Sequence, residues 1–130
     1  MKLEEQITSV ELSNKLKKLG VTEPSIFFRD WTGAKKNEIE MCENYESAYC
    51  IDNVNCYTVA ELGKMLPYHI RIEVKSDDIW FYECTTYKTN EGYAVAYICE
   101  ERLNDKIFQD DTEANARAKM LIHLLEIKLI

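Results

Sequence analysis

Residues 68–99 read YHIRIEVKSDDIWFYECTTYKTNEGYAVAYIC, and this stretch decides the fold class. From 68 to 75 apolar residues alternate with polar and charged ones, which is typical of a strand with one buried face and one solvated face. Residues 79–87 and 93–100 are rich in aromatic and β-branched side chains, and turn-forming residues separate the three runs. The simplest arrangement of these strands is an antiparallel meander.

Three segments with helical signals lie outside this stretch. Residues 8–19 and 58–66 open with the capping-box sequences TSVE and TVAE, and each continues with an apolar stripe. Residues 113–130 follow two aspartates and a threonine, which favour a helix start, and carry a broad apolar stripe. Gly63 would cost the central helix about 1 kcal/mol relative to alanine, so we expect another backbone to pass close to it.

The region before the central helix has weaker patterns. Residues 25–31 are rich in aromatics and predict a strand, 47–51 predict a second short strand, and 52–55 resemble a turn. We therefore predict one α+β domain spanning residues 1–130. In it, the antiparallel sheet has the three-strand meander of about 68–100 plus one or two N-terminal strands, and the N-terminal, central and C-terminal helices pack on it.

Charge and composition exclude several classes of function. The 130 residues contain 16 Lys plus Arg and 23 Asp plus Glu, which gives a formal net charge of −7. The largest cluster of basic residues is Lys15, Lys17 and Lys18, so we expect no direct binding of nucleic acid. The longest apolar run, Tyr93 to Cys99, is far shorter than the roughly 20 residues that span a bilayer. The start MKLEEQ lacks an apolar signal segment, so we expect a cytoplasmic protein with no membrane contact.

The cysteines do not form a metal motif. Their number is odd and no C-x2-C pair occurs, so we expect reduced thiols, no metal site and no cofactor. Two of them, Cys84 and Cys99, lie in strand-like runs and are expected to pack as small apolar side chains. The other three are Cys42, Cys50 and Cys56. Together with His69 they are the best candidates for a pocket with enzymatic or ligand-binding chemistry.

Sequence motifs that would name a reaction are missing. The sequence has no phosphate-binding loop, dinucleotide fingerprint, zinc-protease motif or nucleophile elbow. The acidic pairs Asp77-Asp78 and Asp110-Asp111 fall at a turn and at a helix start, where aspartate serves the backbone. We assign no catalytic residue, and the sequence leans away from an enzyme.

Two surfaces are candidates for binding a protein. If the helices pack on the side of Ala94 and Ala96, the tyrosines Tyr93 and Tyr97 lie on the opposite, open face of the sheet. Their companions there would be either Trp80 and Tyr82 or Ile79 and Phe81, because sequence does not fix the hairpin register. The second candidate is an acidic stretch containing Glu38, Glu40, Glu43 and Glu46.

Three runs of the sequence resemble a known family. They are ITSVELSNKLKKLG at residues 7–20, YTVAELGKMLP at 57–67 and EANARAKMLI at 113–122. Together they resemble a family of small uncharacterised proteins encoded by bacteriophages and prophages. The resemblance implies a viral or mobile-element origin, and hence the cytoplasm of a host cell, but it implies no catalytic residue.

The leading hypothesis is a non-enzymatic accessory protein that binds a host or phage protein, or a second copy of itself. One alternative is a small enzyme or ligand-binding domain. Another is an acidic nucleic-acid mimic or antagonist of a host defence protein, in which Glu38, Glu40, Glu43 and Glu46 would be spaced like phosphates. A virion or assembly component is the last alternative.

Overall fold

A computed structural model describes residues 2–30, 38–41, 53–73, 79–99, 102–103 and 106–130. The elements follow in the order α1 (Leu3–Gln6), α2 (Val10–Lys18), β1 (Phe27–Asp30), β2 (Ile39–Met41), β3 (Asn53–Asn55), α4 (Val59–Met65), β4 (His69–Glu73), β5 (Ile79–Thr89), β6 (Gly92–Cys99), β7 (Arg102–Leu103), β8 (Phe108–Asp110) and α5 (Glu113–Glu126). The predicted α+β class is confirmed.

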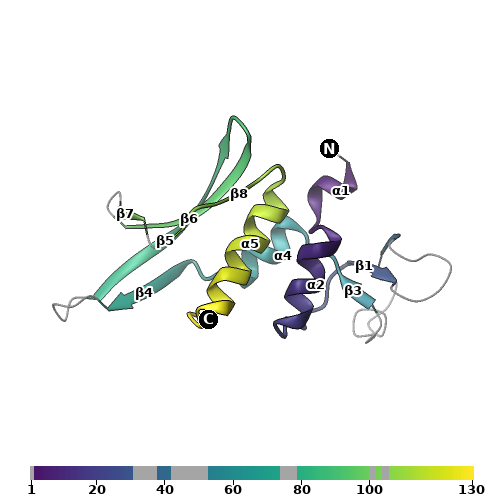
Figure 1. Ribbon diagram of the computed structural model, residues 1–130, viewed down its shortest axis with the longest axis horizontal. Coiled ribbons are helices and arrows are strands. Elements are labelled where there is room, and N and C mark those ends of the chain that lie inside the picture. The colour runs from purple at the N-terminus through teal and green to yellow at the C-terminus, as the bar shows by residue number, and fades with distance from the viewer. Residues whose placement is uncertain (1, 31–37, 42–52, 74–78, 100–101, 104–105) are drawn as a thin grey trace.

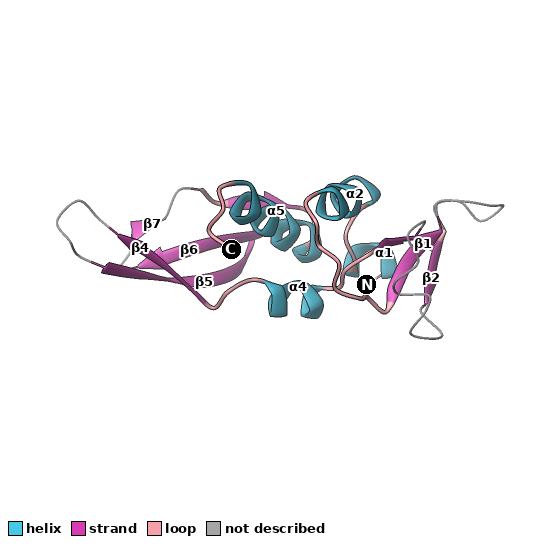
Figure 2. Cartoon of the chain, turned by 90° about the horizontal axis from the view of Figure 1, so that it is seen from below, coloured by secondary structure: helices cyan, strands magenta, loops and turns pink. Residues whose placement is uncertain are grey.

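The predicted meander is the main sheet. Its strands follow the order β4-β5-β6-β7, every neighbouring pair is antiparallel, and β8 also pairs with β6. Strands β7 and β8 were not predicted, because two or three residues are too few to show a periodic pattern. The main sheet lies at one end of an elongated molecule, the small sheet lies at the other, and α2, α4 and α5 lie between them (Figures 1 and 2).

The small sheet has the order β2-β1-β3 and is antiparallel throughout. The strand predicted over 25–31 is present as β1, but it belongs to this separate sheet and does not extend the meander as predicted. The turn predicted over 52–55 is wrong, since Asn53–Asn55 form β3. Pairing with β1 outweighs the local turn preference of asparagine at these positions. The strand predicted over 47–51 lies outside the described residues.

The helix starts show how the helices are joined to the sheets. Thr58 caps α4 in the predicted capping box. Ser9, not the predicted Thr8, caps α2. The Thr8 hydroxyl instead accepts a hydrogen bond from the backbone nitrogen of Tyr57 at 3.1 Å and shares another with Ser13 Oγ at 2.6 Å. Thr8 is fully buried, and it fixes the start of α2 against the segment that leads into α4.

The helices pack on the face of the sheet opposite to the predicted one. Tyr97 is 1% exposed and Tyr82 is 8% exposed, so the tyrosine face is the inside of the protein. The register pairs Cys84 with Tyr97, which places Tyr82 and Trp80 on this same face. Small residues occur in both elements: Ala114, Ala116 and Ala118 of α5 are fully buried, and Ala94 and Ala96 of β6, which alternate with the tyrosines, are buried as well.

Two glycines mark close approaches between elements. A Cβ atom on Gly63 would lie 2.5 Å from Nη1 of Arg117, so the close neighbour in α5 is a side chain and not the predicted backbone. Gly92 has φ of +138°, and a Cβ atom there would overlap the backbone carbonyl of Asp110. Gly92 is therefore needed where the hairpin passes the end of β8.

Candidate functional site

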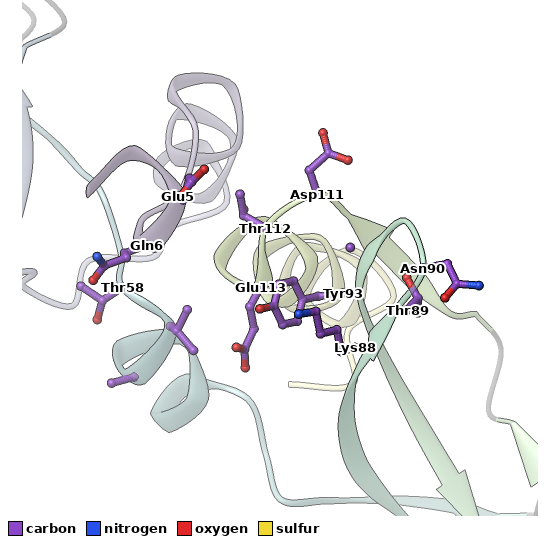
Figure 3. Close-up of a pocket in the computed structure, with 13 residues that line it drawn as sticks. Glu5, Gln6, Thr58, Lys88, Thr89, Asn90, Tyr93, Asp111, Thr112 and Glu113 are labelled. Carbon is purple, nitrogen blue, oxygen red and sulfur yellow. The ribbon is translucent and has the colours of Figure 1, made fainter. Parts of the chain in front are cut away.

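A cavity of about 660 Å³ lies where four segments meet. Its walls come from α1, from the start of α4, from the β5–β6 hairpin and from the start of α5. In Figure 3, Glu5, Gln6 and Thr58 lie on one side of the cavity, and Thr89 and Asn90 of the hairpin lie on the other. Between them lie Thr112, Glu113, Tyr93 and Lys88. Its volume falls in the range of small-molecule sites.

The chemistry of this cavity is mixed and mainly acidic. Glu5, Asp111 and Glu113 supply carboxylates, and Lys88 supplies one cation. The Glu113 carboxylate already accepts hydrogen bonds from Arg117 at 2.8 and 3.1 Å, which neutralises its charge. The described residues that line the cavity include no cysteine and no histidine, so these walls offer hydrogen bonds and charge without the usual nucleophile and base.

The outer face of the main sheet is the second candidate surface. Ile79 is 46% exposed and Phe81 is 59% exposed, and both point away from the helices because they alternate with Trp80 and Tyr82. The register places Phe81 opposite Arg71 on β4, so the apolar side chains have charged neighbours. Large apolar side chains that stand together on an open face are typical of protein-binding surfaces.

The structure separates the four predicted aromatic residues. Tyr82 and Tyr97 are buried in the core, so they do not form an open surface. Trp80 packs against that core and also lines a shallow hollow with Ile79 and Phe81. Tyr93 is half-buried and lines the cavity. The sequence left open which pair accompanies the tyrosines, and the register places Trp80 and Tyr82 beside them, on the inner face.

The two buried tyrosines make hydrogen bonds suited to the protein interior. The Tyr97 hydroxyl donates to the backbone oxygen of Pro67 at 2.6 Å, and the Tyr57 hydroxyl donates to that of Glu23 at 2.7 Å. Burial raises the pKa of Tyr57 to about 12 and raises the pKa of Tyr97 as well. Both hydroxyls stay neutral at ordinary pH and serve the core.

The predicted acidic stretch falls mostly outside the described residues. Glu38 is exposed, Glu40 lies in β2, and Glu43 and Glu46 are not described. The phosphate-like spacing proposed for these residues stays a prediction.

The thiol and imidazole candidates lie in different parts of the fold. Cys56 is fully buried beside the small sheet, where Arg29 Nε donates to its sulfur at 3.2 Å. Burial raises the pKa of this thiol, and Arg29 offsets only part of that effect. His69 stands on β4 of the main sheet and contacts the ring of Tyr68 edge to face. Cys42 and Cys50 lie outside the described residues.

The remaining candidate groups have structural partners. Lys119 Nζ lies 2.6 Å from a carboxylate oxygen of Asp110. Although burial opposes ionisation of Asp110, its hydrogen bond with Lys119 and the charge of that ammonium hold its pKa below the usual value. His123 packs against the ring of Phe108, with 5.2 Å between the ring centres. Asp110 therefore anchors the start of α5, while Asp77 and Asp78 lie outside the described residues.

The described cysteines Cys56, Cys84 and Cys99 are not in disulfides. Within the described part of the chain, no three His, Cys, Asp or Glu residues are grouped so that they could hold a metal ion. None of the described helices has the length and apolar character needed to cross a membrane. Comparison of the chain with known protein families, with curated proteins and with solved structures finds no match.

Proposed function

We propose that this chain is a non-enzymatic protein-interaction module that binds a host or phage protein through the outer face of the main sheet. The observation that carries the proposal is the exposure of Ile79 and Phe81 side by side on β5. The inner face of the same strand is already covered by helices, so stability of the fold does not require large apolar groups on the outer one.

The chemistry of this face defines its partner. The apolar pair has Arg71 and Glu73 directly opposite on β4, while the whole chain carries a net charge of −7. A protein that presents an apolar patch within a basic surface fits both features. Attraction between the net charges would speed the encounter, and burial of Phe81 would supply most of the affinity.

The test compares three versions of the tagged full chain as baits in cells of a host that carries the gene. We expect the wild type to retain a discrete protein and Phe81→Ser to lose it. The matched control is Ile26→Ser, because Ile26 is 55% exposed but lies beside the small sheet, and this variant should retain the same protein. Equal retention by all three baits, or equal loss by both variants, would contradict the proposal.

The cavity favours a second candidate function, a ligand-binding domain. Its volume of about 660 Å³ and its mixed lining suit a small polar molecule. Native mass spectrometry of the chain purified without denaturation would show a bound mass, and Ala60→Trp, which fills the cavity, should remove it. A wild-type chain that carries only its own mass would count against this candidate.

A further inference from the structure

Among the described strands, β4 forms an edge of the main sheet. Strand β4 is the first in the order β4-β5-β6-β7, and it borders the sheet in Figure 1. The backbone nitrogen of Cys84 donates to the oxygen of Tyr68 at 2.9 Å, so Tyr68 and every second residue after it bond toward β5. The N–H and C=O groups of His69, Arg71 and Glu73 therefore point away from β5, and no described strand pairs with them.

This edge lacks several of the features that usually prevent strand pairing. The five residues His69–Glu73 contain no proline, glycine or lysine, and their register with β5 runs without a bulge. Charges do occur, on Arg71 and Glu73, but they have opposite sign and alternate with isoleucines. The edge is thus suited to pair with a strand of matching pattern.

The pattern of β4 matches itself when a second copy is placed antiparallel to it. With Ile72 opposite Ile72 of the second copy, Arg71 lies opposite Glu73 of that copy, and the reverse pair forms by symmetry. Arg71 and Glu73 are also the residues whose backbone groups point outward, so charge pairing and hydrogen bonding favour the same register. Shifting the register by one hydrogen-bonded pair brings Arg71 opposite Arg71 in one direction and Glu73 opposite Glu73 in the other, so both alternatives oppose like charges.

The side chains at this edge have room for a neighbour. Ile72 is only half-buried although it points to the inner face, and so is Trp80, which lies opposite it on β5. The pair of Arg71 and Glu73 within one chain is long, at 3.7 Å, and both side chains are exposed. A second copy would cover Ile72 and supply each charge with a partner across the two-fold axis.

We infer that two copies of this chain associate through β4, with Arg71 of each copy opposite Glu73 of the other. The main sheet then continues across the two-fold axis, and the outer faces of both copies, with Ile79 and Phe81, lie side by side. This inference goes beyond the proposed function, because it uses the edge of the sheet. Dimerisation and partner binding can therefore fail separately.

The experiment is sedimentation velocity on the purified full chain from micromolar to near-millimolar concentration. We expect the wild type to shift from monomer to dimer as concentration rises. Arg71→Glu and Glu73→Arg each replace two attractive pairs by two repulsive ones, so each should raise the dissociation constant about tenfold or more. Glu11→Arg, on the exposed side of α2, changes the net charge as Glu73→Arg does and should leave dimerisation unchanged.

Two rescues test the register itself. The double variant Arg71→Glu with Glu73→Arg exchanges the charges within one chain and should dimerise like the wild type. An equimolar mixture of the two single variants should form a mixed dimer, because every cross-copy pair is then attractive. The inference is overturned by a wild type that stays monomeric throughout, by single variants that dimerise normally, or by failure of both rescues while circular dichroism shows the native fold.

Discussion

Both faces of the main sheet carry aromatic side chains on β5, but the inner face is covered by helices and the outer face is exposed there. On β5, Tyr82 points inward and is almost completely buried, while its neighbour Phe81 points outward and is 59% exposed. Neighbouring positions on the strand thus differ in burial although both residues are aromatic. The helices therefore decide which face of the sheet becomes core, and an aromatic side chain alone does not show which face that is.

We expect the largest loss of stability when an aromatic ring is removed from the inner face of the main sheet. Tyr97→Ala should lower the free energy of unfolding by about 3–5 kcal/mol, because it leaves a cavity under α5. It also removes the hydrogen bond to the oxygen of Pro67. Urea unfolding followed by circular dichroism measures this change. A loss below about 1 kcal/mol would show that the two faces differ less than their burial indicates.

Much of this fold could be predicted because the signals are local. Strict alternation in 68–75 fixed one strand of the meander, and the capping box at Thr58 fixed the start of α4. The face that packs on the helices could not be predicted, because alanines on β6 and on α5 both allow close approach. Strand β3 of the small sheet forms by pairing with β1, which is distant in sequence, so no local pattern predicts it.

The next largest loss of stability is expected at Gly92, in the hairpin that joins β5 to β6. Gly92→Ala should destabilise the fold by roughly 2–3 kcal/mol, because φ at this position is +138° and the new methyl group would meet the backbone of β8. Gly63→Ala is the control, since its new methyl group would meet only the guanidinium of Arg117, which can move. Thermal unfolding of both variants checks the difference. Equal losses would argue against a rigid contact between Gly92 and β8.

A smaller loss of stability is expected when the buried hydroxyl of Tyr57 is removed. Tyr57→Phe removes the hydrogen bond to the oxygen of Glu23 and should cost about 1 kcal/mol at neutral pH. Because burial raises the pKa of Tyr57 from 10.0 to about 12, the folded chain holds this proton more tightly than the unfolded chain. The stabilisation is complete below pH 10 and is lost as pH rises toward 12.

The stability gap between wild type and Tyr57→Phe should therefore narrow between pH 10 and pH 12. Urea unfolding at a series of alkaline pH values measures the gap. A gap that stays constant over this range would mean that Tyr57 ionises equally well in the folded and unfolded chains.

The candidate sites could be predicted less well than the fold. Sequence placed Tyr93 on an open aromatic face of the sheet, whereas it lines the cavity, whose other walls come from segments that only the tertiary structure brings together. Ile79 and Phe81 were weighed as one of two possible pairs beside the tyrosines, and the register shows that they lie on the opposite face. The register of β5 with β6 depends on the geometry of the turn between these strands, which the sequence alone does not fix.

The smallest effect on stability is expected on the outer face. Phe81→Ser should change the free energy of unfolding by no more than about 0.5 kcal/mol, because its ring is more than half exposed and leaves no cavity when it is removed. Ile79→Ser should behave similarly. If urea unfolding shows a loss of several kcal/mol for either variant, then the outer face is part of the core in solution. Stability unchanged together with loss of the bound protein would instead assign these side chains to recognition.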